Sequence, residues 1–225
     1  MKKKEPVVKT KRMMIQPMSD QEIEKLIETS ESGELRAAYE EMLSGCKENP
    51  DNRMWYAPWK MMLEKDHTYI GNLGFKGSPK ENSVEIGYGI LPECEGKGYT
   101  TEAVQAMTQW AFANAGVTFV EAETEPDNKA SQRVLEKCGF TPDGEGKEGP
   151  RFVLEAAMTN WMMIYMLFGL SIGTALGSSF DSQGTGMCLG LCFGMCVGSA
   201  IDVFGKKERE KIREQRKNRR QSFHL

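Results

Sequence analysis

Hydrophobic residues recur with two different periods along the first 155 residues of the chain. Six stretches predict β-strands, at residues 9–18, 54–62, 68–75, 84–91, 117–124 and 151–155, and in 84–91 the apolar side chains of Val84, Ile86, Tyr88 and Ile90 recur at every second position. Stretches with helical spacing predict α-helices, which begin after Ser19, at Glu34, after Gly98 and at Lys129. Ser19 and Glu22 have the spacing of a capping box, and Gly116 and Gly139 stand where helix ends favour a left-handed residue. This order of elements predicts a mixed α/β fold.

The pattern changes after residue 157, where two long apolar segments follow each other. Residues 161–180 are about one membrane span in length, and a second apolar segment follows the polar turn at 181–185. Glycine recurs at every fourth position in both segments, at Gly169, Gly173, Gly177, Gly186, Gly190, Gly194 and Gly198. This spacing lets helices approach closely and is typical of helix packing in membranes. We therefore expect a glycine-zipper helical hairpin that spans a membrane, with a soluble oligomerising hairpin as the alternative.

Charge separates the chain further, although the formal net charge of the 225 residues is only −3. Residues 19–50 carry nine acidic side chains against three basic ones, whereas residues 206–220 carry nine basic against three acidic. We expect three parts: a catalytic domain at 1–157, the hairpin at 158–205 and a basic tail at 206–225. Because the tail adjoins a membrane hairpin, we expect it to meet anionic lipid on the cytoplasmic side rather than nucleic acid.

The six cysteines do not predict a disulfide framework. Three are scattered, and Cys188, Cys192 and Cys196 share one face of an apolar helix with no histidine nearby. We interpret these three as small packing residues, expect no metal, and infer a reducing, cytosolic location for the large domain.

The most informative segment runs from Ile86 to Val104, where a predicted strand enters a glycine-containing loop that opens into a helix. Glycine lets a backbone approach a ligand, and the amides at a helix N-terminus attract anions. The spacing therefore predicts a pyrophosphate on the amides of Gly96, Lys97, Gly98, Tyr99, Thr100 and Thr101, with added charge from Lys97. The segment lacks the Gly-Lys-Ser/Thr of a Walker A loop and the three-glycine dinucleotide pattern.

These residues also resemble a known family. The segment GFKGSPKENSVEIGYGILPECEGKGYTTEAV (74–104) is similar to the central motif of GNAT acetyltransferases, and NKASQRVLEKCGF (128–140) is similar to the motif that follows it. The resemblance covers roughly residues 9–155 and is strongest to the branch that acetylates ribosomal-protein N-termini. It implies a twisted mixed sheet with flanking helices. It also implies acetyl-CoA as co-substrate, held in a slot between splayed parallel strands by Ile90, Leu91, the glycine loop, Asn128 and Ser131. Glu95 and Thr100 depart from the family loop.

The family position also suggests which group removes the proton of the attacking amine. Mapped from the ribosomal-protein branch, the general base is Glu123, and we expect burial to raise its pKa. Glu85, beside the splayed strands, is the competing candidate. Many family members have, at the position of Leu135, a tyrosine that acts as general acid for the departing thiolate. In this chain we expect Tyr88, Tyr99 or water to protonate the thiolate instead.

Two functions remain open from the sequence. The first is an acetyl-CoA-dependent N-acetyltransferase that acts on a small primary amine or a protein N-terminus and is anchored to the cytoplasmic membrane. The second is a catalytically idle CoA-binding or assembly module that works through self-association of the glycine zipper.

Overall fold

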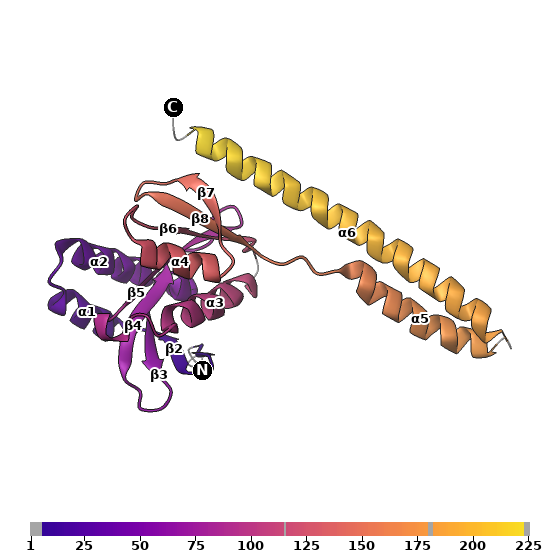
Figure 1. The fold of residues 1–225 in the computed structure, drawn as a ribbon, viewed down its shortest axis with the longest axis horizontal. Coiled ribbons are helices and arrows are strands. Elements are labelled where there is room, and N and C mark those ends of the chain that lie inside the picture. The colour runs from indigo at the N-terminus through magenta and orange to yellow at the C-terminus, as the bar shows by residue number, and fades with distance from the viewer. Residues whose placement is uncertain (1–5, 115, 180–181, 223–225) are drawn as a thin grey trace. The chain divides into compact units, whose positions relative to one another are not determined.

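The computed structural model describes residues 6–114, 116–179 and 182–222, which fall into two compact units that divide after Ala156. In the first unit the strands are β1 Val8–Lys9, β2 Met13–Pro17, β3 Trp59–Leu63, β4 Tyr69–Phe75, β5 Ser83–Ile90, β6 Phe119–Glu123, β7 Thr141–Glu145 and β8 Pro150–Glu155. Its helices are α1 Asp20–Thr29, α2 Gly33–Glu48, α3 Tyr99–Phe112 and α4 Lys129–Lys137, with short 3₁₀ turns at η1 Pro50–Trp55 and η2 Pro92–Cys94. The predicted mixed α/β fold is confirmed (Figure 1).

All eight strands form one sheet in the order β1-β2-β3-β4-β5-β6-β8-β7. Every neighbouring pair is antiparallel except β5 and β6, which run parallel. A parallel pair needs a crossover connection, and α3 supplies it between β5 and β6. The one parallel pair thus lies near the middle of the sheet.

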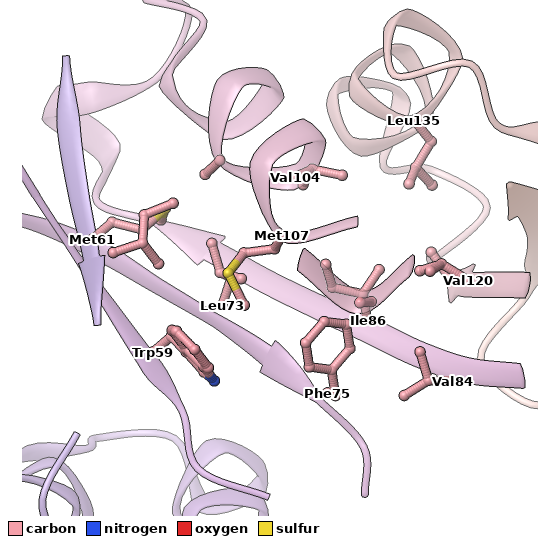
Figure 2. Close-up of a cluster of buried hydrophobic side chains, with 14 of the residues drawn as sticks. Trp59, Met61, Leu73, Phe75, Val84, Ile86, Val104, Met107, Val120 and Leu135 are labelled. Carbon is pink, nitrogen blue, oxygen red and sulfur yellow. The ribbon is translucent and has the colours of Figure 1, made fainter. Parts of the chain in front are cut away.

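Two apolar clusters cover the two faces of this sheet. On one face, α3 and α4 pack Val104, Met107 and Leu135 against side chains of the central strands, as Figure 2 shows. On the other face, Ile23 of α1 and Leu43 of α2 belong to a smaller cluster with Met18, Cys46 and Ala57. Alternate residues of β5 therefore face opposite sides: Val84 and Ile86 are buried under α3 and α4, and Glu85 lies on the α1 and α2 side.

Several local predictions are confirmed, because they depend on neighbours in the chain. Ser19 and Glu22 form the expected capping box at the start of α1. Gly116 and Gly139 have φ of 89° and 87°, the left-handed conformation that glycine adopts at little cost.

The strand boundaries differ from the prediction at three places. The first predicted strand is two strands, because Thr10 closes a turn by accepting a hydrogen bond from the Met13 amide at 3.0 Å through its hydroxyl. The second begins only at Trp59, since the turn at Pro50 continues as η1 and places Trp55 against Phe75. Strand β7 was not predicted, and its Pro142 is tolerated because β7 is the edge strand of the sheet.

The second unit is a hairpin of two helices, α5 Trp161–Ser179 and α6 Gln183–Ser222, which confirms the predicted helical hairpin (Figure 1). α6 continues through the basic residues beyond position 205, so the described part of the basic tail is helical.

The zipper glycines face one another inside this hairpin. A Cβ on Gly169 or Gly173 would collide with the carbonyl of Gly190 or Gly186, respectively. At the open end, the carboxylate of Asp202 accepts hydrogen bonds from the first two amides of α5, those of Trp161 and Met162, both at 3.0 Å. The glycine faces of α5 and α6 are therefore occupied by each other within one chain, so the structure gives no support for the possible self-association through the zipper.

The opposite faces of the hairpin carry large apolar side chains with high exposure. They are Trp161, Met162, Met163, Leu167, Phe168, Ile172, Leu176, Met187, Leu189, Phe193, Met195, Val203 and Phe204. Cys188, Cys192 and Cys196 are also exposed. The interpretation of these three as small packing residues is therefore not supported within the hairpin.

Candidate active site

The parallel strands β5 and β6 separate after a short pairing. Their register covers only Ser83–Glu85 against Phe119–Glu121. β5 then continues for five residues along β4, and β6 continues to Glu123 along β8. Backbone groups on the facing edges beyond Glu85 and Glu121 are therefore not paired with each other. We call this separation of β5 and β6 the V-shaped opening, and the strand edges along it can pair with an extended ligand.

The glycine loop follows the C-terminal end of β5, which is the wide end of this opening because it lies beyond the last paired residues. Gly96 and Gly98 have φ of 70° and 76°, and Gly98 is the N-cap residue of α3 without a side-chain cap. The first backbone hydrogen bond of the helix runs from the Glu102 amide to the Gly98 carbonyl at 3.2 Å. The amides of Tyr99, Thr100 and Thr101 precede that bond and remain available for an anion. No heavy atom lies within 4 Å of a Cβ built on Gly96, so the loop backbone is open to a bulky ligand.

Other predicted cofactor residues take different positions around this loop. The Lys97 ammonium donates to the Glu93 carbonyl at 2.7 Å and so caps η2 rather than extending over the loop. Ile90 ends β5, and the Leu91 amide is already bonded to the Ile70 carbonyl at 2.9 Å. Glu95, whose charge would oppose a phosphate, is exposed.

Arg12 holds the glycine loop in place, a contact that the sequence did not indicate. Its Nε donates to Glu102 Oε2 at 2.7 Å, its Nη1 donates to the Lys97 carbonyl at 3.0 Å, and its guanidinium lies 4.4 Å from the centre of the Tyr99 ring. Glu102 also accepts from the Arg12 amide at 3.0 Å. Burial by itself would raise the pKa of Glu102, but its contacts with Thr10 and Arg12 hold that pKa below its usual range. The hydrogen bond from Arg12 to the Lys97 carbonyl therefore fixes the orientation of the peptide between Lys97 and Gly98.

Tyr88, Ser131 and Asn128 form a polar corner at the side of the opening. Asn128 caps α4 by accepting from the Ser131 amide at 2.9 Å, and the hydroxyls of Tyr88 and Ser131 lie 2.9 Å apart. Burial raises the pKa of Tyr88 to about 12, which keeps its phenol protonated at neutral pH. Leu135, which stands where the family's tyrosine was expected, is fully buried in the core.

Glu123 is held as a carboxylate. Its Oε1 accepts from Arg151 Nη2 and from Arg151 Nε at 2.8 Å, and its Oε2 accepts from the amides of Lys147 and Glu148 at 3.0 and 3.1 Å. Burial alone raises the pKa of Glu123, but the bonds from Arg151 and the two amides lower it below the usual value. The expectation that burial raises this pKa is therefore wrong, because four donors stabilise the charged form.

Glu85 has the opposite environment. It lies at the last paired position before the strands separate, and burial raises its pKa although the Lys76 ammonium donates to it at 2.6 Å. Lys76 also pairs with Glu148 at 2.7 Å. Glu85, Glu123 and Glu148 bring one carboxylate oxygen each within 4.8 Å of the others. Lys76 and Arg151 already pair with all three carboxylates, so this cluster gives no support for a cation site.

Comparison with known proteins agrees with this geometry. A family model described as an acetyltransferase (GNAT) domain matches residues 6–141. The uncharacterised N-acetyltransferase YjdG of Bacillus subtilis is 37% identical over 83 residues, which are 36% of this chain and only 49% of YjdG. The similarly uncharacterised YoaA of Bacillus subtilis is 25% identical over 150 residues, 62% of this chain and 85% of YoaA.

Solved structures share the fold at low identity. The ribosomal-protein-S5-alanine acetyltransferase from Vibrio fischeri aligns with a TM-score of 0.54 and 15% identity, over 69% of this chain and 98% of that one. Mycobacterium smegmatis RimJ in complex with CoA-disulfide aligns with a TM-score of 0.52 and 17% identity, over 67% and 87% respectively. These likenesses establish the architecture of the first unit.

Proposed function

Since this chain belongs to the GNAT acetyltransferase family, we propose that it transfers the acetyl group of acetyl-CoA to a primary amine, either a small amine or a protein N-terminus. The V-shaped opening between β5 and β6 carries the proposal. It has anion-binding amides at its wide end and two carboxylates of opposite pKa behaviour at its narrow end.

The residues of the opening fit this co-substrate. The amides from Gly96 to Thr101 are suited to a pyrophosphate, and Arg12 fixes their geometry before the ligand arrives. Ile90 and Leu91 lead from the strand edge into the loop, and Asn128 and Ser131 stand at the start of α4, where Ser131 contacts Tyr88. Acetyl-CoA supplies the activated acyl group when it is bound.

We assign the base to Glu85 rather than to Glu123. A carboxylate whose lone pairs already accept four hydrogen bonds has no free site for a proton, and its lowered pKa makes it a weak base. Glu85 has one described partner, Lys76, and a raised pKa. As the amine nitrogen bonds to the thioester carbon and the C–S bond breaks, Glu85 takes the nitrogen's proton, directly or through a water. The Tyr88 phenol donates to the departing sulfur and regains its proton from solvent.

The test is acetyl-CoA consumption by the full-length protein against a panel of amines and peptides. Glu85→Gln should lower kcat about 10²–10⁴-fold, the usual contribution of a general base, without weakening acetyl-CoA binding. Glu148→Gln is the matched control, because it removes a second carboxylate from the same Lys76 and should leave kcat nearly unchanged. Tight acetyl-CoA binding without turnover of any acceptor would instead support the idle CoA-binding module.

The α5–α6 hairpin anchors this enzyme to the cytoplasmic membrane in our proposal. Both helices are long and apolar enough to cross a membrane by length and composition. α5 has 19 residues, a length of about 28 Å against a hydrocarbon core of about 30 Å. Hydroxyls on α5 bond within their own helix: Ser171 donates to Leu167, Thr174 to Ser171 and Ser178 to Thr174, at 2.8–2.9 Å. Such groups need no water, which suits a lipid environment.

The contact between Asp202 and the start of α5 supports the proposed orientation in the membrane. This contact places the entry to the hairpin and the basic part of α6 at the same end, and basic flanks favour the cytoplasmic side. Full-length protein should sediment with membranes and require detergent for release, whereas a variant truncated after Ala157 should stay in the supernatant. Full-length protein that remains soluble after high-speed centrifugation would indicate a soluble oligomerising hairpin instead.

A further inference from the structure

On the face of β5 directed toward α1 and α2, two consecutive positions carry no side chain. Gly87 and Gly89 lie on this face, opposite to Ile86 and Tyr88, which are directed at α3 and α4. A Cβ built on either glycine meets no heavy atom within 4 Å. The backbone beside the V-shaped opening is therefore an uncovered floor, with Glu85 at one end of it.

A polar cluster stands at the other end of this floor. Asn72 of β4 pairs in register with Gly89, so its side chain lies beside that glycine on the same face. The Asn72 amide nitrogen donates to the Tyr39 hydroxyl at 2.9 Å and to the Tyr69 hydroxyl at 3.0 Å. Tyr39 comes from α2 and Tyr69 from the start of β4, so three elements contribute to what we call the phenol cluster, Tyr39, Asn72 and Tyr69.

The phenol cluster is poised to donate hydrogen bonds. Each phenol oxygen accepts from Asn72, so its own proton is directed elsewhere, and within the described residues neither proton has an acceptor. Burial raises the pKa of Tyr69, which keeps its hydroxyl protonated. Two O–H donors that are half-buried beside an open floor can donate to a ligand oxygen that displaces water from this face.

We propose that the phenol cluster recognises the acceptor of the acetyl group by donating hydrogen bonds to a peptide carbonyl, while the acceptor's amine lies toward Glu85. The proposal rests on the proposed acetyltransferase function and narrows its substrate class to amines that carry amide carbonyls, as a peptide N-terminus does. Gly89 lies four residue steps along β5 from Glu85, or about 13 Å. An extended peptide covers that length with about three to four residues, so a carbonyl within the first few residues meets the cluster.

The test compares two acceptors on the full-length protein in detergent: the tripeptide amide Ala-Ala-Ala-NH₂, which has a free α-amine and an amide carbonyl at its third residue, and hexylamine, which has no oxygen. Tyr39→Phe and Tyr69→Phe should each raise KM for the tripeptide about tenfold, the loss of one net hydrogen bond. Neither should change kcat, KM for acetyl-CoA or KM for hexylamine. A substitution that merely loosened the fold would affect both acceptors alike, and that result would overturn the proposal.

Tyr56→Phe is the matched control. Tyr56 packs against the same apolar cluster as Tyr39 and Tyr69, but its hydroxyl lies 3.1 Å from Ser78 Oγ. This variant should leave the tripeptide KM unchanged.

The remaining outcomes separate this inference from the function on which it rests. Unchanged tripeptide KM in both variants, or a wild-type preference for hexylamine, would overturn the inference while leaving the acetyltransferase intact. A wild-type protein that acetylates no amine at all would overturn both.

Discussion

The contrast between Glu123 and Glu85 leads to a prediction about stability rather than catalysis. Glu123→Gln keeps the shape of the side chain but removes the charge that Arg151 and two amides recognise. The glutamine oxygen can still accept from Arg151, but its NH₂ group would then face the amides of Lys147 and Glu148, which are donors themselves. Glu123 is 5% exposed and Arg151 20% exposed at the side chain, so water replaces these bonds poorly.

The magnitude follows from that loss. Removing one partner of a buried ion pair costs about 3–5 kcal/mol, and glutamine recovers part of it, so we expect about 3 kcal/mol. For a chain of this size each kcal/mol lowers Tm by about 2–4 °C, which gives a fall of about 6–12 °C. Intrinsic tryptophan fluorescence of the full-length protein in detergent reports the transition, since Trp55, Trp59 and Trp110 pack together in the first unit.

Acid dependence gives the prediction a second readout. The folded-state pKa of Glu123 is lowered, so its contribution to stability is present above the unfolded-state value, about 4.5, and is lost as pH falls through the folded value. The stability difference between wild type and Glu123→Gln should therefore be largest near pH 7 and shrink below about pH 4.5.

Glu85→Gln is the matched comparison for Tm. Its pKa is raised, so ionisation of Glu85 opposes folding, and Lys76 keeps Glu148 as a partner. We expect its Tm to stay within about 2 °C of wild type, a shift of at most 1 kcal/mol. The reasoning would be refuted by a Glu123→Gln protein that keeps the wild-type Tm but loses turnover a hundredfold, since Glu123 would then be the base.

Two further predictions concern glycines. Gly98→Val places a β-branched residue at a φ of 76° in the loop and should weaken acetyl-CoA binding at least tenfold by calorimetry, whereas Gly116→Val imposes similar strain outside the loop and should leave the affinity unchanged. Equal affinity in both variants would place the pyrophosphate elsewhere. Gly190→Leu should separate α5 from α6 and accelerate hydrogen exchange at the first amides of α5, because any Cβ there overlaps the Gly169 carbonyl. Gly184→Leu, on the same helix with no atom within 4 Å, should preserve the protection, and comparable exchange in the two variants would contradict the zipper packing.

The sequence by itself determined the features that depend on near neighbours in the chain. The capping box at Ser19, the left-handed glycines and the order of strands and helices, apart from β7 and the division of the first strand, follow from local backbone chemistry, which needs no tertiary contact. The glycine loop and the two apolar segments were predictable for the same reason, because a short run of residues contains the whole signal.

Only the tertiary structure decided which residues contact one another in the candidate site and in which direction the pKa of each carboxyl group shifts. Arg12 reaches Glu102 across 90 positions because α3 packs against β1 and β2. Arg151 reaches Glu123 across 28 positions because the register of β6 and β8 pairs them. Whether burial or hydrogen bonding dominates a pKa depends on how many donors converge on one carboxylate. Glu85 and Glu123 look equivalent along the chain, and they acquire opposite shifts because four donors meet one of them and a single lysine meets the other.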